Sequence, residues 1–192
     1  VDARCFAGSG INKITIGTHV TGLGNSFDNN SKLTTVIFES RKGIKDPQKL
    51  TISSFNNCGI TKIVFPEYDK DLPRELMLWV REGFNNNPIK ELKMPDAINT
   101  LIDNSFRNCQ LEKVYLGDNT YNIGDSSFVG NKLKWLDIPP SVYWLDGVDA
   151  EYLFAHNGFR RPRNDGKKYK NNILCPTKCK KDFEDWIDKD VA

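Results

Sequence analysis

Apolar residues recur along the chain in one arrangement at long, nearly regular intervals. A phenylalanine is followed five or six residues later by an aliphatic residue, then by a second apolar residue three positions on and a third two positions after that. The phenylalanines of the six copies are Phe6, Phe27, Phe55, Phe84, Phe106 and Phe128. Six copies of one arrangement predict a repeat architecture.

Each copy ends in alternating apolar and polar residues rich in β-branched side chains, the pattern of a short strand. Strands that recur about every 22 residues must pair in parallel, and each intervening segment supplies the return path. We expect an α/β solenoid, with one continuous parallel β-sheet and short helical or turn segments on its other side. The expected strands are 11–16, 33–38, 60–65, 89–94, 111–116 and 133–138.

The position three residues after each phenylalanine holds a small polar or thiol side chain. Its occupants are Ser9, Asn30, Cys58, Asn87, Cys109 and Asn131. This recurrence predicts an inward-facing residue that bonds to the backbone at the corner before the strand. Cys58 and Cys109 are therefore expected to be buried, reduced and unreactive.

The recurring text resembles the BspA-type, or Treponema-type, leucine-rich repeat. Residues 54–58 read S-F-N-N-C and are followed by I-V-F-P at 63–66, and residues 105–109 read S-F-R-N-C. The resemblance covers about residues 3 to 146. It implies a leucine-rich-repeat horseshoe and, from what is common in that family, a surface-exposed adhesin that binds host or matrix proteins.

Two repeats are longer than the others. The second carries a polar excursion over 39–49. The third carries residues 71–83, where Asp71 as cap, Pro73 in the first turn and Gly83 as stop predict a helix. Its apolar spacing would turn Trp79 inward, so Trp79 is interpreted as a core residue.

The chain divides into repeats over 1–150, about six of them and truncated at the N-terminus, and an atypical last repeat with a C-terminal cap over 151–192. A last strand is expected at 173–176 and a capping helix over 178–189. Cys175 and Cys179 could form a disulfide or remain separate thiols. The basic stretch 160–170 is either a solvated loop or a site for an acidic partner.

Composition and motifs exclude several function classes. The net charge of +2 is far below that of a dedicated nucleic-acid binder, so no nucleic-acid partner is expected. No apolar run is long enough to span a membrane, so no membrane insertion is expected. The two histidines, His19 and His156, sit in no catalytic or metal-binding arrangement. We therefore expect neither catalysis nor a metal or cofactor.

The candidate binding surface is the outward side of the strands, toward the C-terminal copies, where aromatic and charged residues coincide. Alternatively, Tyr115 and Trp135 only stack as neighbouring rungs of the sheet. The candidate site residues are Lys93, Lys113, Tyr115, Trp135 and Asp137, with Tyr143 and Trp144 at the rim.

These features favour a non-catalytic module that binds a protein or glycan, including one of host origin, within an adhesin-like protein at the cell surface or outside the cell. Two alternatives stay open: a structural or receptor-binding component of a larger assembly such as a phage fibre or surface filament, and a targeting module of a larger enzyme.

Overall fold

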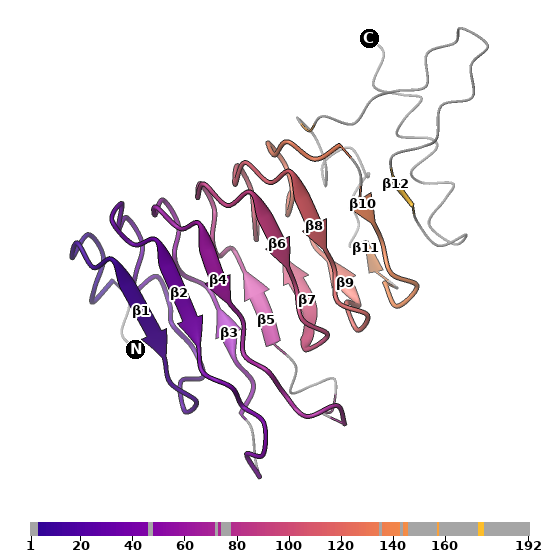
Figure 1. Ribbon diagram of the computed structural model, residues 1–192, viewed down its shortest axis with the longest axis horizontal. Coiled ribbons are helices and arrows are strands. Elements are labelled where there is room, and N and C mark those ends of the chain that lie inside the picture. The colour runs from indigo at the N-terminus through magenta and orange to yellow at the C-terminus, as the bar shows by residue number, and fades with distance from the viewer. Residues whose placement is uncertain are drawn as a thin grey trace, which may run out of the picture.

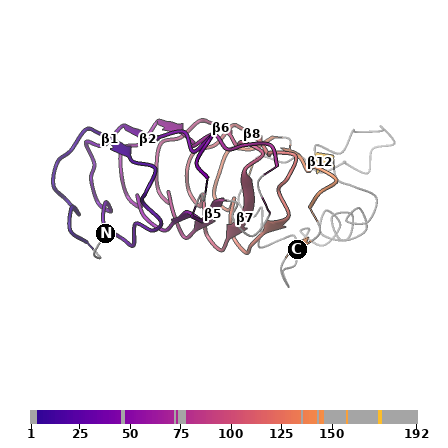
Figure 2. The ribbon, with the colours of Figure 1, turned by 90° about the horizontal axis from the view of Figure 1, so that it is seen from below.

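The chain winds into stacked coils that together form a flattened tube (Figures 1 and 2). The computed structural model describes residues 4–45, 48–71, 73, 78–134, 136–142, 144–145, 157 and 173–174. Within these residues the elements are strands and turns, with no helix. A typical coil contributes one short strand to each broad side of the tube, so the protein is a parallel-strand solenoid.

The strands expected from the apolar repeat lie on one side of the tube, which we call the first sheet. Each expected segment contains a strand, and the strand expected near residue 173 is also present. The strands of this side are β1 (Lys13–Ile16), β2 (Thr35–Phe38), β4 (Lys62–Val64), β6 (Glu91–Lys93), β8 (Lys113–Tyr115), β10 (Leu136–Asp137) and β12 (Ile173–Leu174).

The first sheet is interrupted, so the prediction of one continuous sheet was wrong. Its hydrogen-bonded ladders are β1-β2-β4, β6-β8 and β10-β12, all parallel. The interruption between β4 and β6 coincides with the longest repeat, whose insertion directly follows β4. Among the described residues β4 has no strand partner on that side.

A second parallel sheet covers the opposite side, where short helical or turn segments were expected. Its order is β11-β9-β7-β5-β3, and Gly22 extends it by a bridge to Thr51. Figure 2 shows β5 and β7 on the side of the tube away from β1, β2, β6 and β8. Its strands are β3 (Thr51–Ile52), β5 (Leu78–Arg81), β7 (Ile98–Ile102), β9 (Asn122–Ile123) and β11 (Trp144–Leu145).

The helix predicted over 71–83 is wrong for residues 78–81, which form β5 between β3 and β7. Leu78 and Val80 are buried while Trp79 between them is half-buried, the alternation of a strand. Trp79 is thus not a core residue, and the Lys49 amine lies 2.7 Å from its ring centroid. Pairing with strands on both sides overrides the local helical signal. Residues 72 and 74–77 of that helix, and the capping helix over 178–189, lie outside the described residues.

The repeating phenylalanines form a continuous column through the tube. Neighbouring ring centroids are 5.2–6.2 Å apart and the ring planes lie within 14° of one another. Phe55, Phe84, Phe106 and Phe128 are completely buried, as expected, whereas Phe6 at the N-terminal end is 45% exposed. The column is the centre of the hydrophobic core.

The residue three positions after each phenylalanine joins one coil to the next. The Nδ2 group of Asn87 donates to the carbonyl of Phe84 in its own coil (2.8 Å) and of Phe55 in the preceding coil (2.7 Å). Its Oδ1 accepts from the backbone N–H of Ile60 (3.0 Å). The same pattern of bonds is made by Asn30 and Asn131, and Asn157 reaches the preceding coil alike.

Two cysteines replace asparagine at this position and keep its bond to the preceding coil. The thiol of Cys58 donates to the Phe27 carbonyl (3.3 Å) and that of Cys109 to the Phe84 carbonyl (2.9 Å). Both are free and buried, whereas Cys5 is free and exposed. Burial raises the pKa of the Cys58 thiol to about 11 and that of Cys109 to about 12.

A row of asparagine side chains runs along the outside of the same corner. Asn29, Asn57, Asn86 and Asn108, two positions after each phenylalanine, all have left-handed backbone, with φ between 55° and 62°. The amides of Asn57, Asn86 and Asn108 each donate to the asparagine of the preceding coil, at 2.7–3.2 Å. Gly8 and Gly130 fill this position at the two ends. Asparagine and glycine are the residues that tolerate this conformation best.

Substituting a ring inside the column should destabilise the fold far more than substituting the ring at its open end. Phe106→Ala should lower the free energy of unfolding by about 3–5 kcal/mol, because the ring is completely buried. Phe6→Ala, whose ring is half-exposed, should cost less than about 1.5 kcal/mol. Urea unfolding followed by circular dichroism measures both. Equal losses would show that the column is not the core.

Cys58 and Cys109 should resist thiol reagents in the folded protein, while Cys5 serves as an internal control. At about pH 8 only a minute fraction of thiols with such raised pKa values is ionised, and the thiolate is the reactive form. Peptide mapping after a short exposure to iodoacetamide should find Cys5 modified and the other two intact until denaturant is added. Rapid modification of both in the native protein would contradict the structural assignment.

Candidate binding surfaces

The outward side of the first sheet carries the side chains that strand alternation predicts. Leu92 and Val114 point into the core, and the residues on either side of each are exposed. Tyr115 is 42% exposed, which is unusual for a large apolar ring. Of the expected outward residues, those that the structure shows exposed are Lys13, Thr15, Lys62, Val64, Glu91, Lys93, Lys113 and Tyr115.

Three of the candidate residues meet on the ladder of β6 and β8. Parallel register sets Lys93 opposite Tyr115 and Glu91 opposite Lys113. The Lys93 amine lies 5.7 Å from the Tyr115 ring centroid and 3.4 Å from Glu91 Oε1. Exposed contacts of this kind contribute little to stability. These contacts place the Lys93 ammonium group beside the exposed Tyr115 ring, and both groups can contact a ligand.

The remaining candidate residues do not all join this group. Trp135 and Tyr143 lie outside the described residues, as does the basic stretch 160–170. Asp137 is described as part of β10, which places its backbone on the first sheet. Trp144 lies in β11 and pairs with Asn122 of the second sheet, so its backbone belongs to the opposite side of the tube. Its backbone therefore does not lie on the first sheet.

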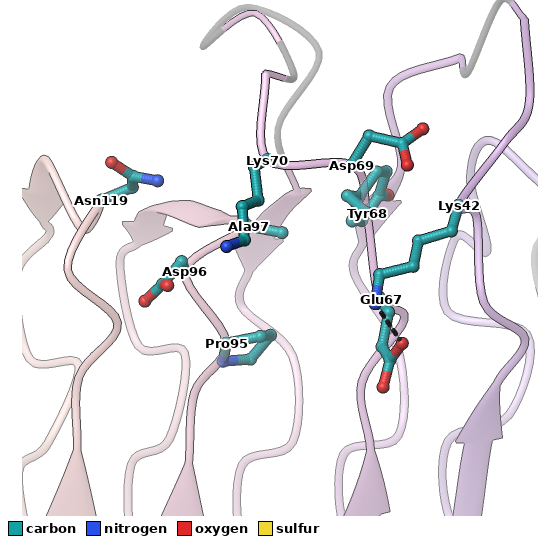
Figure 3. Close-up of a pocket in the computed structure, with 9 residues that line it drawn as sticks. All are labelled: Lys42, Glu67, Tyr68, Asp69, Lys70, Pro95, Asp96, Ala97 and Asn119. Atoms are coloured by element: carbon teal, nitrogen blue, oxygen red, sulfur yellow. Dashed lines mark ion pairs between the residues drawn. The ribbon is translucent and has the colours of Figure 1, made fainter.

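A cavity of about 530 Å³ opens at the corners that follow the first sheet (Figure 3). The corner after β4 contributes 67–70, the corner after β6 contributes 95–97, and Lys42 and Asn119 complete the lining. It therefore lies at the interruption of the first sheet. No repeating position in the sequence indicates this cavity, because it arises between two corners of unequal length.

The charged groups of this cavity are largely engaged with the protein itself. Lys42 forms a 2.8 Å ion pair with Glu67, which raises the pKa of the lysine and lowers that of the carboxylate. Asp69 accepts from the backbone of Gly43 (2.9 Å), and Asp96 from that of Asp118 (2.9 Å). The acidic side chains thus fasten neighbouring corners together, which is a structural use of their charge.

A buried arginine anchors the polar excursion of the second repeat. Arg41 is only 2% exposed. Its guanidinium donates to the carbonyls of Gln48 (3.0 Å) and of Val20 in the preceding coil, and its backbone N–H donates to Glu67 of the next (2.7 Å). Arg41 therefore joins three consecutive coils.

A shallower polar groove of about 460 Å³ crosses the corner between the second sheet and the phenylalanine turns. Its lining is mostly amide and hydroxyl side chains. Two of the amides are already bonded along the stack, since Asn56 and Asn85 each accept from the backbone of the following coil. The groove residues are Asn25, Thr51, Ser53, Asn56, Arg81, Glu82, Asn85 and Asn104.

Within the described residues, no three His, Cys, Asp or Glu side chains are placed to hold a metal ion. Nor does this part of the chain contain a helix long and apolar enough to cross a membrane.

The repeated sequence matches a known family over most of the chain. The model of the BspA type leucine-rich repeat region, in six copies, matches residues 1–76 and 80–155. No curated protein and no solved structure is detectably similar to the chain. The match spans well over half of the 192 residues and agrees with the parallel-strand coils. The chain belongs to the BspA type leucine-rich repeat family.

Proposed function

We propose that this protein is a non-catalytic binding module that recognises a protein or glycan through the outward side of its first sheet. The observation that carries the proposal is Tyr115, whose large ring is 42% exposed beside Lys93 on a hydrogen-bonded ladder. Repeat solenoids present extended surfaces of this kind to their partners.

The physical argument concerns the entropy of binding. Ordering flexible side chains and loops on association costs free energy, so groups already fixed on a rigid sheet bind with a smaller penalty. An aromatic ring adds a large contact area with few rotatable bonds. Tyr115, Lys93 and Lys113 combine these properties on two adjacent strands, and Asp137 of β10 continues the same side.

The wider setting of the proposal is adhesion. We place the module in an adhesin-like protein outside the cell or on its surface, with a protein or glycan partner that can come from a host. The family resemblance supports this setting, and nucleic acid is not among the partners we propose. Assembly into a fibre or filament, or targeting of a larger enzyme, would use the same surface.

Replacing Tyr115 should weaken binding strongly. Beads coated with the purified protein would be tested for adhesion to extracellular-matrix glycoproteins and to cultured epithelial cells, and the partner that captures them would be titrated. Tyr115→Ala should weaken this binding by about 2 kcal/mol, or roughly 30-fold, the loss typical of an anchor residue.

The matched control is Thr15→Ala, which alters an exposed residue of the same side at the far end of the sheet. It should change the dissociation constant less than about two-fold, because exposed contacts outside an anchor cluster contribute little. Equal affinities for the two variants would show that Tyr115 is only a rung of the sheet, and would overturn the proposal.

A further inference from the structure

The lysines of the first-sheet side are gathered into one band. The strands and the residues that lead into them span 9–16, 31–38, 59–65, 88–94, 110–116 and 132–138, and contain no arginine. Their acidic residues are Glu91, Glu112 and Asp137. Their lysines, all exposed, are Lys13, Lys32, Lys62, Lys90, Lys93, Lys113, Lys132 and Lys134, which we call the lysine band.

The corners where the strands end carry both signs of charge. Glu39 directly follows β2, and Glu67, Asp96 and Asp118 occupy the corresponding corners of later coils, all exposed. Exposed Lys42 and Lys70 lie at the same corners, and Lys42 is paired with Glu67. A broad anionic surface laid over the sheet would meet both signs, whereas a thin chain lying along the band would meet mainly lysine.

The band runs along the axis of the tube. Parallel register aligns Lys13, Thr35 and Lys62 on successive strands, and later aligns Glu91 with Lys113. Because paired strands are about 4.8 Å apart, lysines recur at intervals of roughly 5–10 Å along the axis. Within the described part of the chain, Lys93 is the only one of the eight lysines that forms an ion pair.

We propose that the partner of this side is a linear polyanionic glycan, a chain of sugars bearing sulfate or carboxylate groups, that lies along the lysine band. The inference rests on the proposed function, because both use the outward side of the first sheet. Tyr115 lies within the band and is 42% exposed, and an aromatic ring of this kind can pack on the C–H face of a sugar ring.

The composition of the band suits a carbohydrate chain. Its cations are compact ammonium groups without arginine, so they act as spaced point charges. Exposed Thr15 adds a hydroxyl near Lys13 that can bond to sugar hydroxyls. Spaced point charges with a hydroxyl and one aromatic ring fit a chain that presents hydroxyls and C–H faces between its charges.

The test measures binding of the full chain to a heparin octasaccharide by isothermal titration calorimetry at several salt concentrations. Lys62→Glu combined with Lys113→Glu should raise the dissociation constant at least about ten-fold and flatten its salt dependence. The control combines Lys45→Glu with Arg107→Glu, two exposed cations outside the band, and changes the net charge equally. It should raise the dissociation constant less than about two-fold, and thermal unfolding would verify that both variants are folded.

Each outcome decides the inference. Polyglutamate and oligothymidylate of matched charge should compete at least about ten-fold less effectively than heparin, and equal competition by either would overturn the choice of a glycan. Equal loss in the two double variants would show a response to net charge alone, which also overturns it. If heparin does not bind while Tyr115→Ala still abolishes adhesion, the glycan inference fails and the proposed function stands.

Discussion

The solenoid depends on one buried hydrogen bond that is repeated from coil to coil. Three residues after each core phenylalanine, an amide or thiol donates to the phenylalanine carbonyl of the preceding coil. A buried carbonyl without a partner costs free energy. Where asparagine occupies this position, the phenylalanine carbonyl also accepts from its own coil. The bond that comes from the neighbouring coil is the one that fixes how one coil sits on the next. The stacking of the rings and the register of the strands follow from that alignment.

Sequence periodicity predicted the part of the fold that repeats. The apolar pattern located the first-sheet strands and the phenylalanine column, since each is defined by a position that recurs six times. It did not reveal the second sheet, where β3, β9 and β11 are two residues long and carry no alternation of their own. Those strands form because the backbone N–H and C=O groups of neighbouring coils lie in register and pair with one another. Residues 78–81 show the same effect, since strands on both sides outweighed a local helical signal.

The candidate site could be predicted only where it depends on strand alternation. Leu92 and Val114 face inward. Because successive side chains of a strand point to opposite faces, their neighbours Lys93, Lys113 and Tyr115 face outward. The place of Trp144 depended instead on where the return segment crosses to the other side of the tube. The corner cavity depends on the difference in length between two successive corners. That difference cannot be seen in the sequence of any single repeat. A repeating pattern does not predict contacts between successive coils that differ in length.

The interruption between β4 and β6 gives the tube an uneven stiffness. At this joint the second sheet continues unbroken through β3, β5 and β7, the Phe55 and Phe84 rings stay stacked at 5.3 Å, and Asn86 bonds to Asn57. The first-sheet side has no ladder there to resist tension. A bending load at this joint is therefore resisted by the second sheet and by the column of rings. The distance between Lys62 and Lys93 is accordingly set by those contacts and not by a first-sheet ladder.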